Sequence, residues 1–217
     1  WVKGGKQGLF EEDNFTSPGY AVRLNYTGVP GLRLSGSFYY CANTGSNADK
    51  SQTYDGLGKL PLRIYNFEGQ YKNRYVEARA SVLWGNLTNS NVVSSKNTKL
   101  SNKSPYSRIT PVAHKAIACG GEAGLRLKGF SASEKMPDII PFVRYEYYNS
   151  QEEVTAPNVA DARCKVSMWT MGANWRALPN LVVKADYTTR SIGGGNYNSE
   201  NEFAVGVAWA AWFLNGK

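Results

Sequence analysis

The residues of this chain that could do chemistry are charged side chains that alternate with apolar ones. In the segment VVKADY, Lys184 and Asp186 alternate with Val183 and Ala185. Side chains two positions apart point to the same face of a β-strand. The pattern therefore predicts a strand with one charged and one apolar face. Charged residues in such rows can line a water-filled passage, form pairs across neighbouring strands, or attract small anions and lipid phosphates.

Other site chemistries find little support in the sequence. The three cysteines, Cys41, Cys119 and Cys164, have no CxxC spacing, so neither a zinc site nor a redox motif is predicted. His114 is the single histidine and lies in a predicted loop, where we expect an exposed residue and not a metal ligand or catalytic base. We therefore expect no catalytic site, no metal and no cofactor.

The net charge of +8 and the pI near 9.3 suggest an anionic partner. The basic residues form no run and no motif with aromatic platforms, because they are scattered along the chain about one per predicted strand. This distribution argues against nucleic acid as a partner. It favours lining or rim charges that meet lipid phosphates or small anions.

The charged positions are carried by predicted β-strands. The chain is rich in residues that favour pleated strands, with 14 Tyr, 6 Trp and 8 Phe, and has 22 Gly for turns. No apolar run approaches the roughly 20 residues of a membrane-spanning helix. Alternation predicts nine strands, at residues 19–28, 32–40, 62–71, 75–84, 121–129, 141–149, 167–177, 181–190 and 201–213.

The connections between these strands alternate between tight turns and long polar loops. Such asymmetry is typical of outer-membrane barrels, which have short turns on one side and long loops on the other. The sequence therefore predicts an all-β protein, a transmembrane antiparallel up-and-down β-barrel. The alternative is a soluble β-sandwich or barrel with its apolar side chains inside, because alternation alone does not separate the two.

A barrel assigns each strand residue to lipid or lumen. The predicted lipid-facing residues are Val76, Ala78, Val82, Leu125, Leu127, Val143, Val183, Val205 and Val207. The predicted pore-lining residues are Arg23, Arg33, Glu68, Glu77, Arg79, Glu122, Arg126, Lys128, Arg144, Glu146, Arg176, Lys184, Asp186, Arg190 and Glu202. Nine of these are basic and six are acidic, which predicts a mild preference for anions. Many of them should instead pair within the wall, as Glu77 with Arg79 and Arg144 with Glu146. Aromatic residues near strand ends suit the membrane interfaces, namely Tyr26, Tyr40, Tyr65, Trp84, Tyr147 and Trp175.

The segments PFVRYEYYN, MGANWRALPNLVVKADYTTR and NEFAVGVAWAAWF resemble the last strands of the phosphate-selective porins of the O and P type and of related porin-like proteins of didermic bacteria. The resemblance covers about the last 80 residues. It implies an outer-membrane location. If the ninth strand ends in the periplasm, the alternation of turns and loops makes the first strand begin outside, whereas bacterial barrels have an even number of strands and both termini in the periplasm. We therefore expect residues 1–217 to be the C-terminal portion of one barrel whose N-terminal strands are missing, with residues 1–18 as an external loop. Phosphate selectivity is not carried over, because a dense basic ladder is lacking. The chain also continues past Phe213, where the family pattern would stop.

The expected function is passive diffusion of small hydrophilic solutes across an outer membrane. The alternative is a non-conducting barrel that scaffolds a secretion, assembly or nutrient-uptake complex. An outer-membrane enzyme is a poor third, since no histidine lies on a predicted strand. The expected partners are outer-membrane lipid and lipopolysaccharide, and a homo-oligomer or a larger envelope complex. The three thiols should be free and lie near the external ends of the second, fifth and seventh strands.

Overall fold

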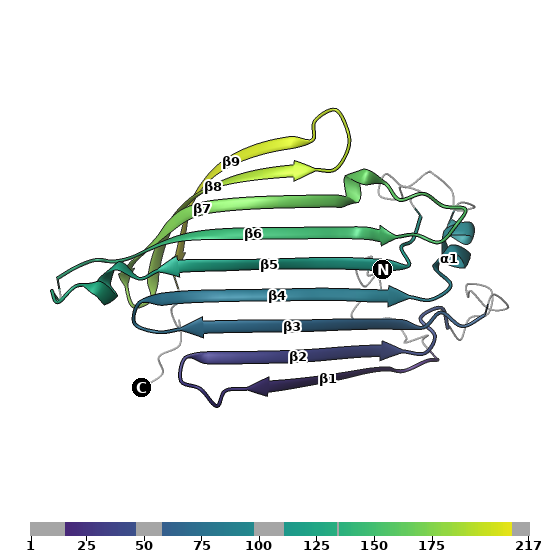
Figure 1. Cartoon of the computed structure of the whole chain (residues 1–217), viewed down its shortest axis with the longest axis horizontal. Helices are drawn as coiled ribbons and strands as arrows, with labels where there is room; N and C mark the ends of the chain where they lie inside the picture. Colours follow the sequence, from purple (N-terminus) through teal and green to yellow (C-terminus); the bar gives the residue numbers. More distant parts are fainter. Residues whose placement is uncertain (1–15, 47–57, 98–110, 134, 210–217) are drawn as a thin grey trace.

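Nine β-strands form a single antiparallel sheet in which every strand pairs with its neighbours in sequence (Figure 1). The computed structural model describes residues 16–46, 58–97, 111–133 and 135–209. The strands are β1 (Gly19–Tyr26), β2 (Leu32–Cys41), β3 (Leu62–Lys72), β4 (Val76–Leu87), β5 (Lys115–Leu125), β6 (Asp138–Glu153), β7 (Lys165–Leu178), β8 (Leu181–Ile192) and β9 (Ser199–Trp209). The helices are α1 (Ser90–Asn97), η1 (Leu127–Phe130) and η2 (Ala162–Cys164). Among the described residues, the helices are all too short or too polar to cross a membrane.

The prediction of an all-β fold with antiparallel up-and-down strands is confirmed by this nine-stranded sheet. In the described part of the chain, β1 pairs only with β2 and β9 only with β8, so the sheet has two free edges and is not a closed barrel. Closure and membrane insertion therefore remain proposals.

The connections lie at two opposite ends of the strands. We call one the turn end, which carries residues 27–31, 73–75, 126–133, 135–137 and 179–180, and the other the loop end, which carries residues 42–46, 58–61, 88–97, 111–114, 154–164 and 193–198. The predicted strict alternation is wrong in one respect. Residues 126–137 at the turn end, which contain η1, outnumber residues 193–198 at the loop end. The hairpins at the turn end are otherwise tight, as expected.

The two faces of the sheet differ sharply in chemistry. Residues that are partners in register share a face, so the pairing assigns each strand residue to one side. The apolar face carries, among others, Tyr20, Val22, Leu24, Leu34, Phe67, Val82, Trp84, Val143, Trp169, Met171, Tyr187, Phe203, Val205 and Val207. Most of these side chains are exposed, up to 74% for Leu24. The opposite or polar face carries most of the charged strand residues together with many Ser, Ala and Gly.

The nine predicted lipid-facing residues test this assignment. Eight of them lie together on the apolar face. Leu127 is the exception, because it lies in η1 and not in a strand. The predicted interfacial aromatics also share the apolar face, where Tyr65 stacks on Trp84 with ring centroids 5.2 Å apart.

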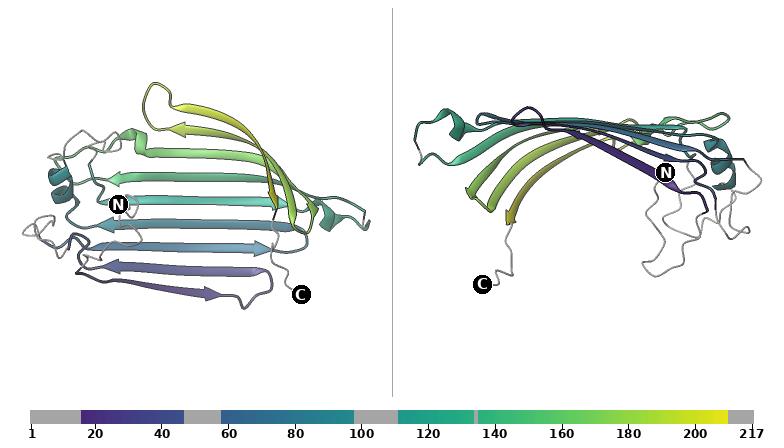
Figure 2. Two further views of the ribbon diagram at one scale, coloured as in Figure 1. Left: turned by 180° about the vertical axis from the view of Figure 1, so that it is seen from behind. Right: turned by 90° about the horizontal axis from the view of Figure 1, so that it is seen from below.

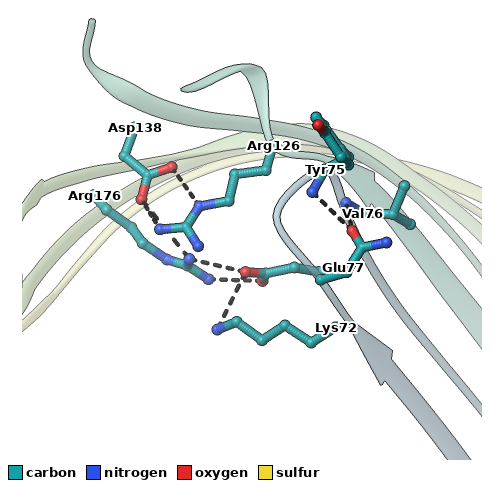
Figure 3. Close-up of polar contacts among 8 residues, drawn as sticks. Lys72, Tyr75, Val76, Glu77, Arg126, Asp138 and Arg176 are labelled. Carbon is teal, nitrogen blue, oxygen red and sulfur yellow. Dashed lines mark hydrogen bonds and ion pairs between the residues drawn. The ribbon is translucent and has the colours of Figure 1, made fainter. Parts of the chain in front are cut away.

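The sheet curves strongly, and the polar face is its concave side (Figures 2 and 3). Arg176 on β7 donates hydrogen bonds of 2.9 and 2.7 Å to Glu77 on β4. Three strand spacings separate β4 from β7, which is about 14 Å on a flat sheet. In addition, the register places Glu77 level with Gly172 and not with Arg176. The two side chains can therefore meet only because the sheet bends toward them.

A single layer of strands leaves little room for a core. The one packed cluster of buried apolar residues in the described chain consists of Leu60, Leu62 and Leu87. Val93 from α1 and Val112 pack against it at the loop end. Leu62 and Leu87 belong to the polar face, so folded loops cover that face over β2–β4 at this end. Elsewhere the broad apolar surface has no protein cover among the described residues.

The fifth strand was predicted in the wrong place. Residues 121–129 were expected, whereas β5 spans Lys115–Leu125. The chain leaves the sheet after Leu125, and the Arg126 amide donates to the Tyr75 carbonyl as the turn toward η1 begins. Arg126 and Lys128, predicted as pore-lining strand residues, therefore lie in the connection at the turn end.

Candidate functional site

Most of the predicted pore-lining residues do lie together on the concave polar face. The register places thirteen of the fifteen there: Arg23, Arg33, Glu68, Glu77, Arg79, Glu122, Arg144, Glu146, Arg176, Lys184, Asp186, Arg190 and Glu202. Arg126 and Lys128 are the two that the strands do not carry. A shared face was thus predictable from alternation.

The centre of this face holds a ladder of alternating charges on adjacent strands. Arg79, Glu122 and Arg144 are direct register partners on β4, β5 and β6. The Glu122 carboxylate accepts from Arg79 at 3.2 Å and from Arg144 at 2.7 Å, and Arg144 also lies 3.7 Å from Glu146. The predicted pair of Arg144 with Glu146 is therefore present. Arg79, in contrast, pairs with Glu122 and not with Glu77, since its neighbour across the sheet is closer than the residue two positions along its own strand.

A polar hollow of about 300 Å³ lies beside this ladder. It is lined by Glu68, Gln70, Arg79, Ser81, Glu122, Arg144 and Glu146. Ser81 and Gly120 are register partners at its floor, and the missing side chain of Gly120 keeps the floor low. The surrounding carboxylates, guanidiniums and hydroxyls can hydrogen-bond water or a small hydrophilic solute. A larger hollow of about 620 Å³ lies among apolar side chains such as Leu24, Leu34 and Phe67, where the sheet offers little chemistry.

A second group of charges, the turn-end cluster, comprises Lys72, Glu77, Arg126, Asp138 and Arg176 (Figure 3). Arg176 bridges the two carboxylates, with two hydrogen bonds to Glu77 and a 3.9 Å contact to Asp138. Lys72 Nζ lies 3.2 Å from Glu77, and Arg126 donates to both Asp138 oxygens, at 3.0 and 2.5 Å. This hydrogen bonding raises the pKa of Arg126, so its guanidinium stays charged. The cluster ties β3, β4, β6, β7 and the η1 connection together.

The remaining charges of the polar face form shorter-range pairs. Arg23 reaches across β2 to Glu68 at 2.7 Å. Lys184 contacts Asp186 at 2.9 Å, and Arg190 contacts Glu200 at 2.9 Å. Most charges on this face thus have a partner of opposite sign.

Three further charged residues of this face lie just outside the predicted strands, because the prediction ended β3 too early and began β6 and β9 too late. They are Lys72, Asp138 and Glu200. The strands of the polar face then carry eight basic residues, Arg23, Arg33, Lys72, Arg79, Arg144, Arg176, Lys184 and Arg190. They also carry eight acidic residues, Glu68, Glu77, Glu122, Asp138, Glu146, Asp186, Glu200 and Glu202.

The cysteines and His114 take no part in these networks. All three thiols are free, as predicted. Cys41 and Cys164 lie at the loop end as expected, but Cys119 lies inside β5, because that strand starts earlier than predicted. His114 precedes β5 and is half-buried, with Nδ1 2.9 Å from the Leu87 carbonyl. The described residues contain no group of three His, Cys, Asp or Glu side chains arranged to hold a metal ion.

No family model, no curated protein and no solved structure matches this chain. The resemblance to the phosphate-selective porins therefore stays a prediction.

Proposed function

We propose that this chain forms part of the wall of a membrane-spanning β-barrel in a bacterial outer membrane, through which small hydrophilic solutes diffuse passively. The observation that carries the proposal is the segregation of the two faces. Every predicted pore-lining residue that a strand carries lies on the concave face, and many large exposed apolar residues lie on the convex one. A soluble sheet would cover such an apolar face with a second layer.

The energetics of the bilayer support the same proposal. Apolar side chains are stable against hydrocarbon, whereas a Lys or Arg at the bilayer midplane costs roughly 2–4 kcal/mol. The concave face would meet water in a barrel, which tolerates charges such as Arg79 and Glu122. The free edges of β1 and β9 would have to be paired, because unpaired backbone groups are not tolerated in hydrocarbon. We propose further strands of the same barrel as their partners.

The charge count makes any ionic preference weak. The strands of the polar face are balanced, and Arg126 and Lys128 at the turn end add a small basic excess. We propose a mild preference for anions that arises at this end. Phosphate selectivity would need a denser basic surface than the described residues provide.

The test is conductance of the purified full-length protein in planar lipid bilayers. Stepwise ion-conducting insertions, with a reversal potential slightly on the anion side in dilute salt, are expected. A protein that inserts into the bilayer but conducts no ions contradicts the diffusion function. A protein that does not enter bilayers at all contradicts the membrane assignment.

One feature favours a second candidate, the non-conducting scaffold. The cluster of Leu60, Leu62 and Leu87 with α1 places folded loop over the polar face at the loop end. A barrel whose mouth is filled in this way would serve to hold partner proteins. The same bilayer experiment separates the two, since silent but inserted protein supports the scaffold.

A further inference from the structure

The apolar face carries few charges, and their positions are not random. Within the described strands, its charged residues are Arg63, Lys115, Glu153 and Lys165, and the Glu152 carboxylate also reaches this face, where it accepts a hydrogen bond of 2.8 Å from Asn149. Arg63 is the second residue of β3, while Lys115 and Lys165 are the first residues of β5 and β7. All three basic residues therefore lie at the loop end. The strand residues of this face at the turn end are instead uncharged, with aromatics such as Tyr71 and Trp209.

The three basic residues form a row along the sheet. They lie on every second strand, so neighbours in the row are separated by about 10 Å across the sheet. We call Arg63, Lys115 and Lys165 the basic row. Arg63 and Lys165 have no carboxylate partner within the described part of the chain. Lys115 has one, Glu153, at 2.5 Å, but both side chains stay about half exposed, at 51% and 49%.

The surroundings suit a membrane interface and not a protein core. The Arg63 guanidinium lies 5.6 Å from the centroid of the Tyr40 ring, which supports it from the apolar side. Asn86 is the register partner of both Arg63 and Lys115, so a polar side chain also occupies the strand between these two basic residues. Below it the face becomes apolar, with Tyr65 and Trp84 stacked on adjacent strands. Charged side chains above an aromatic layer are placed where lipid headgroups begin.

We propose that the basic row binds phosphate-bearing lipid headgroups of the membrane leaflet at the loop end. The proposal rests on the membrane function proposed above. Its chemistry follows from the charges, because Lys and Arg at a membrane surface attract anionic lipid, by roughly fivefold in affinity for each residue. Two members without a carboxylate partner among the described residues, and one shared with Glu153, predict a total effect of about 25-fold. The absence of charge from the turn-end strand residues makes the binding specific to one leaflet.

Titration of the purified full-length protein in neutral detergent tests the site. The probe is a fluorescent diphosphorylated lipid A, with the dephosphorylated lipid and inorganic phosphate as comparisons. The variant Arg63→Gln, Lys115→Gln, Lys165→Gln should bind the phosphorylated lipid about 25-fold more weakly than the wild type. Restoring Arg63 alone should recover about fivefold.

The matched control removes the same three charges from the turn end, as Arg74→Gln, Lys128→Gln, Lys135→Gln. It should bind the phosphorylated lipid like the wild type. Equal binding by both triple variants, or equal affinity of the wild type for the dephosphorylated lipid, overturns the site. Competition by millimolar inorganic phosphate alone would overturn the choice of lipid as the ligand.

Failure of this site and failure of the membrane function give different results. Heat-modifiable migration on gels reports a folded barrel in each variant. A folded protein that enters bilayers but does not distinguish the two lipids contradicts the basic row only. A protein that neither folds in detergent nor enters bilayers contradicts the proposed function, and with it the site.

Discussion

The bridge between Arg176 and Glu77 should contribute measurably to stability, since it joins strands that are not neighbours. We consider a double-mutant cycle with Glu77→Gln and Arg176→Gln. The pair makes two hydrogen bonds, at 2.9 and 2.7 Å, and its side chains are only 28% and 24% exposed. Fully exposed pairs are worth roughly 0.2–1 kcal/mol, whereas breaking a buried pair costs roughly 3–5 kcal/mol. Partial burial places the coupling energy between them, at about 1–2 kcal/mol.

The assay is equilibrium unfolding by urea in neutral detergent, followed by tryptophan fluorescence. The exposed pair Lys115–Glu153, cycled in the same way with Gln, is the control and should couple by less than about 0.5 kcal/mol. Lys72 remains near Glu77 in the single variant Arg176→Gln, so the Glu77 carboxylate is not left isolated there. A coupling energy for Arg176 and Glu77 no larger than that of the control would refute the argument from curvature and partial burial.

Three further outcomes are expected. In a background without native cysteines, Val183→Cys and Val205→Cys should react only with membrane-phase thiol reagents, whereas Ser81→Cys should react with aqueous ones. Aqueous labelling at positions 183 and 205 would reverse the assignment of faces. Replacing at least two of Arg79, Arg126, Arg144 and Lys184 with Glu should move the reversal potential toward cation preference. The shift should be seen mainly in dilute salt, because charges are screened beyond about 8 Å at physiological ionic strength. An unchanged reversal potential would show that these side chains do not act on the permeating ions. Gly31→Ala should lower stability by about 1–2 kcal/mol, because Gly31 has φ +80° and an added Cβ would meet the Lys72 carbonyl oxygen, whereas Gly206→Ala, with nothing within 4 Å, should be nearly neutral.

Local alternation was enough to predict most of the strands and the sharing of faces. Period-2 patterning is strong where each face has one chemistry, as in β8, where Val183 and Ala185 oppose Lys184 and Asp186. It failed at β5, whose sequence KAIACGGEAGL contains little but small residues. Such a strand is positioned by its partners, for example Val82 and Tyr147 on either side of Cys119. Non-local pairing of this kind leaves no local signal.

The charge networks were predictable only in part. Arg144 and Glu146 are two apart on one strand, so their contact follows from the sequence. Arg176 and Glu77 are far apart in the chain and on strands that do not pair. Their contact depends on the bend of the whole sheet, which no window of residues encodes. Arg126 and Lys128 show the opposite error, because Leu125 and Leu127 continue the alternation beyond the residue where the strand ends.

The strand order has a consequence for how the molecule folds. Because each strand pairs only with its sequence neighbours, contact order is low for an all-β protein, and the sheet can grow one hairpin at a time. The entropic cost of each step depends on the loop that must be closed. Joining β7 to β8 closes only residues 179 and 180, whereas joining β4 to β5 closes residues 88–114. We therefore expect two early units, β1–β4 and β5–β9, with the β4–β5 junction as the last and slowest pairing step.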